Sequence, residues 1–135
     1  MRWPATILLP FTLLTGACLG TDPSEAILGQ EFELAPNQST RIVGSDLIVG
    51  FRRVAGDSRC PIDLVCVVEG TAGIELEVFG GDVSGPVLVA DPLPATWTDG
   101  TYQIQLLDLL PHPTAGRAIN PDEYRLRLVV DRPPQ

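Results

Sequence analysis

The spacing of apolar residues constrains the fold of this chain more than any other feature. Along Glu31–Leu34, Phe32 and Leu34 alternate with acidic residues, and along Tyr124–Val130 every second residue is apolar. A period of two residues is typical of β-strands with one buried face, and no segment shows the 3.6-residue period of a helix. The sequence therefore predicts short strands and no long helix.

Further segments show the strand pattern and are separated by turn-forming glycine, proline, asparagine, aspartate and serine. They are Thr40–Val43, Asp46–Val54, Val67–Val78, Val87–Ala90, Ala95–Thr98 and Thr101–Leu106. The alternation shifts by one residue at Arg53-Val54, which indicates a β-bulge. About seven short strands spaced roughly ten residues apart predict an all-β fold, a single antiparallel, immunoglobulin-like β-sandwich over residues 29–132.

The segment Asp99–Tyr102 fits two local structures. It can be the tight turn of a hairpin between Ala95–Thr98 and Thr101–Leu106. It also resembles the tyrosine corner of immunoglobulin-like domains, where a tyrosine hydroxyl binds the backbone at a crossing between sheets. Both are structural roles for Tyr102.

The N-terminus has the composition of a secretory signal. Arg2 is followed by the acid-free run Trp3–Ala17, whose apolar part Ile7–Leu14 is shorter than the roughly 20 residues that span a bilayer. We therefore predict a signal peptide at residues 1–17.

Leu14–Cys18 resembles the lipobox of bacterial lipoproteins. That resemblance implies that Cys18 is lipidated and becomes the first residue, with Leu19–Leu28 as a tether. It also implies a lipid-anchored protein of the cell envelope. In a Gram-negative cell the protein would face the periplasm from the outer membrane, because Leu19 rather than aspartate follows the cysteine. The alternative is cleavage near Ala17 without lipidation, which gives a secreted soluble protein.

The charge of the chain limits its partners. All nine basic residues are arginine, against 17 acidic residues, and the net charge is −8. Loss of Arg2 leaves eight arginines and a net charge of −9. This balance disfavours nucleic acid and electrostatic attachment to anionic lipid, so the lipid anchor is the expected membrane contact.

Cys60 and Cys66 remain once Cys18 is assigned to lipid. The signal directs the protein to an oxidising compartment, so we expect a disulfide between them that closes a short loop. Two free thiols are the alternative.

The surrounding motif runs from Asp57 through Ser-Arg-Cys-Pro, four residues and Cys66. It resembles a pattern in small bacterial secreted or lipid-anchored proteins of no established activity. Those proteins often carry Trp-Ala-Gly after the second cysteine, whereas this chain has Val68-Glu69-Gly70. The resemblance implies kinship and no particular activity.

Arg52, Arg53 and Arg59 surround this loop and are the candidate binding residues. Guanidinium groups bind carboxylates and phosphates in bidentate fashion, so a free cluster would form a recognition surface at the end of the sandwich. Alternatively, Asp57 and Asp63 neutralise the arginines, and the loop is a structural staple.

Catalytic and metal motifs are absent from the sequence. The single histidine, His112, lies between prolines, and no Gly-x-Ser-x-Gly motif accompanies it. Asp57, Asp63 and Glu69 form the best acidic cluster for calcium but lack the alternating Asp/Asn pattern of a dedicated loop. We therefore predict no metal site, no cofactor and no catalytic residues.

Two classes of function remain open. The favoured one is a non-catalytic binding or assembly module for an envelope protein or glycan. The alternative is a small envelope hydrolase or an inhibitor-like protein. The lack of a nucleophile motif, phosphate loop or cofactor fingerprint favours binding.

Overall fold

The computed structural model describes residues 24–135. The predicted signal peptide, Cys18 and the start of the expected tether lie outside the described residues. Nine strands and one short 3-10 turn, η1 (Pro121–Glu123), make up the regular structure. The strands are β1 (Glu25–Ile27), β2 (Glu31–Leu34), β3 (Gln38–Val43), β4 (Ile48–Asp57), β5 (Ala72–Phe79), β6 (Gly85–Val89), β7 (Ala95–Thr98), β8 (Gln103–Leu110) and β9 (Arg125–Asp131).

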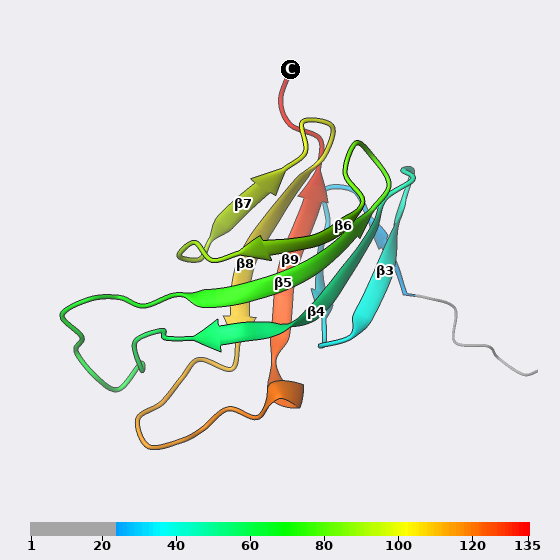
Figure 1. Cartoon of the computed structure of the whole chain (residues 1–135). Helices are drawn as coiled ribbons and strands as arrows, with labels where there is room; N and C mark the ends of the chain where they lie inside the picture. Colours follow the sequence, from blue (N-terminus) through cyan, green and yellow to red (C-terminus); the bar gives the residue numbers. More distant parts are fainter. Residues whose placement is uncertain (1–23) are drawn as a thin grey trace, which may run out of the picture.

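The strands form two sheets packed face to face, as Figure 1 shows. One sheet has the order β1-β3-β4-β5-β6 and the other the order β2-β9-β8-β7. All neighbours are antiparallel except β1 and β3, which are parallel. The predicted all-β sandwich is confirmed.

The order of the strands differs from that of immunoglobulin domains. Consecutive strands β3 to β6 fill most of one sheet, and β7 to β9 fill most of the other. Immunoglobulin domains instead place their first, second, fourth and fifth strands in one sheet. Short connections favour pairing between consecutive strands, which gives two meanders here.

The core lies between the sheets and uses the predicted inward faces. Leu47, Val49 and Phe51 are completely buried, as are Leu126 and Leu128 on the opposite sheet. Burying one such side chain stabilises the fold by about 1.5–3 kcal/mol. The inward positions follow directly from the two-residue period.

The N-terminal boundary of the sandwich was predicted too late in the chain. Residues 25–27, expected in the tether, form β1, which pairs with Arg41–Val43 of β3. Ala26 is buried against the core, and Gly29 takes a positive φ of 78° in the turn to β2. A strand of three residues is too short to show alternation.

The strand predicted from Val67 begins only at Ala72. Val67 and Val68 are exposed, in the loop between β4 and β5. Their β-branched side chains suit a strand, but no neighbouring strand pairs with them. Meanwhile β4 extends to Asp57, past register shifts on both sides of Arg53-Val54 that confirm the expected bulge.

Of the two structures considered for Asp99–Tyr102, the hairpin turn is present. β7 and β8 pair from Ala95 opposite Leu106 to Thr98 opposite Gln103. The Tyr102 hydroxyl donates to Asp46 Oδ1 at 3.1 Å, so it reaches a side chain in the β3–β4 turn of the other sheet rather than the backbone. No helix within residues 24–135 is long and apolar enough to cross a membrane.

Candidate functional site

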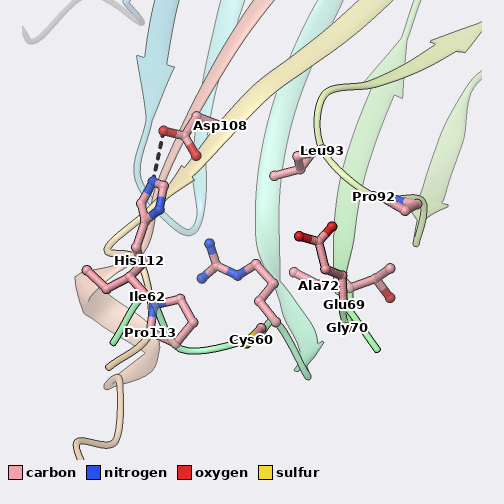
Figure 2. Close-up of a pocket in the computed structure, with 12 residues that line it drawn as sticks. Cys60, Ile62, Glu69, Gly70, Ala72, Pro92, Leu93, Asp108, His112 and Pro113 are labelled. Atoms are coloured by element: carbon pink, nitrogen blue, oxygen red, sulfur yellow. Dashed lines mark hydrogen bonds and ion pairs between the residues drawn. The ribbon is translucent and has the colours of Figure 1, made fainter. Parts of the chain in front are cut away.

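Three loops meet at one end of the sandwich and enclose a pocket of about 260 Å³. They are the β4–β5 loop (residues 58–71), the β6–β7 loop (90–94) and the β8–β9 loop (111–124). We call this cavity the loop-end pocket. Figure 2 shows its lining, which comprises Arg59, Cys60, Ile62, Glu69, Gly70, Thr71, Ala72, Pro92, Leu93, Asp108, His112 and Pro113.

The β4–β5 loop is closed by the expected disulfide. Cys60 and Cys66 are bonded, with their Cα atoms 6.0 Å apart. Two hydrogen bonds connect this loop to the β8–β9 loop: Ile62 N donates to Pro113 O at 2.9 Å, and Ala115 N donates to Asp63 Oδ1 at 2.9 Å. The disulfide closes the β4–β5 loop, and the two hydrogen bonds hold that loop against the β8–β9 loop.

Arg59 joins the same two loops through its guanidinium group. Its Nε and Nη2 donate to the two carboxylate oxygens of Asp57 at 2.8 and 2.7 Å. Nη1 donates to Leu109 O at 2.5 Å, and Nη2 also donates to Pro111 O at 3.1 Å. The Arg59 and Asp57 side chains are only 14% and 13% exposed. The guanidinium is therefore a structural clamp.

Tyr124 completes this cluster by donating from its hydroxyl to Asp57 Oδ2 at 3.0 Å. Burial opposes ionisation of Asp57, but hydrogen bonds from Arg59 and Tyr124 and the charge of Arg59 outweigh it and lower the pKa of the carboxyl. Burial, followed by the hydrogen bond to Asp57 and its negative charge, raises the pKa of Tyr124 to about 12. Asp57 is therefore held as an anion and Tyr124 as a neutral donor.

Arg52 and Arg53 do not join Arg59 at the pocket. They lie on the outer face of β4, where Arg52 Nη1 pairs with Glu77 at 2.7 Å and Arg53 Nε pairs with Glu75 at 2.7 Å. The bulge of β4 allows two consecutive side chains to reach the same acidic row on β5.

All three candidate arginines are thus paired with carboxylates. This matches the alternative in which acidic residues neutralise the arginines, rather than a free cluster that forms a recognition surface. The partners differ in part from those expected. Asp57 pairs with Arg59, but the Asp63 carboxylate accepts a backbone N–H of the β8–β9 loop, and glutamates of β5 pair with the other two arginines.

His112 lies on the pocket wall and contacts a carboxylate. Its Nε2 is 3.1 Å from Asp108 Oδ2, while Asp108 Oδ1 accepts the backbone N–H of Leu109 at 2.9 Å. Figure 2 shows this pair at one side of the pocket. A histidine oriented by a carboxylate is two thirds of a nucleophilic triad. The hydroxyl-bearing residue among the pocket's lining is Thr71, and Cys60 is held in the disulfide.

Glu69 is a pocket residue that we considered only as a calcium ligand. Its carboxylate extends into the pocket from the side opposite His112, toward Leu93 (Figure 2). Within residues 24–135 it forms no hydrogen bond or ion pair, unlike Asp57, Asp63 and Asp108. The signal in the sequence was its position, as an acidic residue three positions after the second cysteine, behind Val67 and Val68.

The β4–β5 loop also carries five exposed aliphatic side chains. They are Ile62, Leu64, Val65, Val67 and Val68, and we call this group the apolar loop. They project beyond the sandwich on the long β4–β5 loop seen in Figure 1. Sequence reasoning placed Val67 and Val68 in a strand and so missed this surface.

The acidic residues considered for calcium do not share a site. Asp57 faces Arg59, Asp63 accepts a bond from Ala115, and Glu69 faces the pocket. In the part of the chain that the structure describes, no group of three or more His, Cys, Asp or Glu side chains is placed to hold a metal ion.

Comparison of the chain with protein-family models, with curated proteins and with solved structures finds no match in any of the three.

Proposed function

We propose that this chain is a lipid-anchored protein of the cell envelope, attached through Cys18, and that it acts as a non-catalytic binding module. The lipobox-like run Leu14–Cys18 supports the anchor. The Cys60–Cys66 disulfide supports an oxidising compartment, since such bonds persist outside the cytosol.

The observation that best supports the binding role is the arrangement of the three loops at one end of the sandwich. A disulfide and hydrogen bonds from two loops hold exposed aliphatic side chains beside a small polar pocket. Binding residues tend to lie on loops held by a rigid scaffold, and large exposed apolar patches mark interaction sites. The apolar loop and the loop-end pocket meet both criteria.

Metabolic labelling with a palmitate analogue tests the anchor. We expect the wild-type protein to take up label and to fractionate with membranes, and a Cys18→Ala variant to do neither. A Cys60→Ala/Cys66→Ala variant is the matched control, because it loses two cysteines but keeps the lipidation site. Continued labelling and membrane retention of the Cys18→Ala protein would contradict the proposal.

A small hydrolase is the second candidate, and the pair of His112 with Asp108 in the pocket favours it. Hydrolysis would require a nucleophile within reach of His112 Nδ1, because Nε2 faces Asp108. A fluorophosphonate probe tests this directly, because it phosphonylates activated hydroxyl nucleophiles, and Thr71 carries the hydroxyl in the pocket lining. Labelling that disappears in a His112→Ala variant would establish the hydrolase and overturn the non-catalytic role.

A further inference from the structure

We propose that the apolar loop and the loop-end pocket form one docking surface for a protein partner that places a lysine or arginine side chain in the pocket. This inference deepens the binding role proposed above and rests on it. It assigns the surface that binds and the chemistry of the partner.

The apolar half of the surface is held open by the fold. Val65 and Val67 are 101% and 104% exposed, and the other three residues of the apolar loop are each more than half exposed. The disulfide between Cys60 and Cys66 and the bond from Ile62 N to Pro113 O prevent the loop from folding back onto the sandwich. A contiguous group of this kind in a soluble domain marks a contact surface.

The charge of the pocket favours a cation. Arg59 is its one permanently charged cation, and Asp57 balances that charge from beneath. The carboxylates of Glu69 and Asp108 remain, and Glu69 has no partner within residues 24–135. A basic side chain that entered the pocket would supply the partner that Glu69 lacks.

The size of the pocket favours a single side chain. Its volume of about 260 Å³ is enough for one long side chain and lies at the low end of the range of pockets that take whole small-molecule ligands. Pro92, Leu93 and Pro113 provide apolar walls beside the carboxylates. Such walls suit the aliphatic stem of lysine or arginine, whose charged end then reaches Glu69.

A protein fits this surface better than a lipid bilayer does. Loops and helices that enter the membrane interface carry aromatic and basic residues, which bind headgroups. Residues 60–69 contain neither, and they include Asp63 and Glu69. A second copy of the chain is also a poor occupant, because it would bring together two surfaces of the same negative charge.

Site-specific photocrosslinking in the producing cell tests the proposal with the full chain. A benzophenone amino acid replaces Val65, and the crosslinked peptide is identified by mass spectrometry. We expect a protein crosslink near a lysine or arginine of the partner. The matched control carries the benzophenone at Leu88, an exposed aliphatic residue on the outer side of β6, and gives no such product.

Variants of Glu69 that also carry the benzophenone at position 65 show whether the crosslink depends on the charge in the pocket or only on nonspecific hydrophobic contact. Glu69→Lys is expected to reduce the crosslink at least tenfold, because it places a cation where the partner's cation binds. Glu69→Asp is expected to keep most of it. Retention of the disulfide in both variants, read from intact mass, shows that the loop remains closed.

Three outcomes would overturn the docking surface: crosslinks to lipid, to a second copy of this chain, or to no product. A protein crosslink that Glu69→Lys leaves unchanged would overturn the role of the pocket. Repeating the experiment in the Cys18→Ala background distinguishes failure of the anchor from failure of the surface. A crosslink that survives there supports the surface even if the protein is not lipidated.

Discussion

At the scale of single residues, the candidate arginines have different roles. Arg52 and Arg53 lie on the exposed face of β4, whereas Arg59 lies next to the disulfide. Arg53 is a 64% exposed side chain paired with Glu75 across two strands. Arg59 is 14% exposed and bridges Asp57 to the backbone carbonyls of Leu109 in β8 and Pro111 in the β8–β9 loop. Exposed pairs contribute little to stability, whereas removing one partner of a buried pair leaves an uncompensated charge.

Arg59→Gln should therefore lower the free energy of unfolding by about 2 kcal/mol, since it removes the charged partner of Asp57 and the side-chain donor of two carbonyls. Urea denaturation of the purified protein measures the loss. Arg53→Gln is the matched control and should change stability far less, because its pair faces solvent. Equal losses in the two variants would contradict the clamp.

The phenol of Tyr124 gives a second test of the same cluster. The pKa of Tyr124 is raised to about 12 from 10.0, so the folded state holds its proton more tightly than the unfolded state does. The stability that this proton contributes is present below pH 10 and is lost as the pH rises toward 12. Absorbance titration should show a tyrosine ionising near 12, and that step should vanish in Tyr124→Phe.

At the scale of elements, the β4–β5 loop depends on its disulfide more than the strands beside it do. The closed loop is short, with a sequence separation of 6 between the cysteines. Chain entropy for a loop of this length corresponds to about 2 kcal/mol. The strands themselves have a separate source of stability in the shared core.

Reduction should thus lower the unfolding free energy by about 2 kcal/mol and add the mass of two hydrogen atoms. Hydrogen exchange should accelerate in residues 58–71 and stay slow in β8 and β9. Complete alkylation of both cysteines before reduction would show that the bond does not form. A uniform rise in exchange over both sheets would show that the staple supports the whole fold.

At the scale of the whole molecule, the two sheets share one core. Phe51 on β4 is completely buried, and the core cluster includes residues of β4, β5, β8 and β9. Within residues 24–135, neither sheet has another apolar layer to cover its inner face. The two sheets should therefore unfold together.

Phe51→Ala should lower the free energy of unfolding by about 3–5 kcal/mol, since it removes the largest fully buried side chain of residues 24–135 and leaves a cavity. Circular dichroism in the far ultraviolet and tryptophan fluorescence should give coincident unfolding curves. Trp97 lies on β7 of the second sheet, so in a Trp3→Phe background its fluorescence reports on the sheet opposite the substitution. Separate transitions would mean that the sheets are stable independently.

The sequence by itself determined the class of fold, most of the inward-facing residues and the pairing of Cys60 with Cys66. These properties are local: a two-residue period identifies a half-buried strand, and two cysteines so close in the chain meet without help from the rest of the fold. The prediction was wrong for short or irregular segments, because it depends on a local two-residue period. Glu25–Ile27 is too short to show a period, and Val67-Val68 has strand-like residues but no partner.

Only the tertiary structure decided the order of strands and the composition of the loop-end pocket. Arg59 binds carbonyls of Leu109 and Pro111, and Glu69 faces His112 across a cavity built from three loops. Such contacts join residues some 50 positions apart, which no local pattern records. The exposure of the apolar loop is decided in the same way, because a hydrophobic side chain is buried only where another part of the chain covers it.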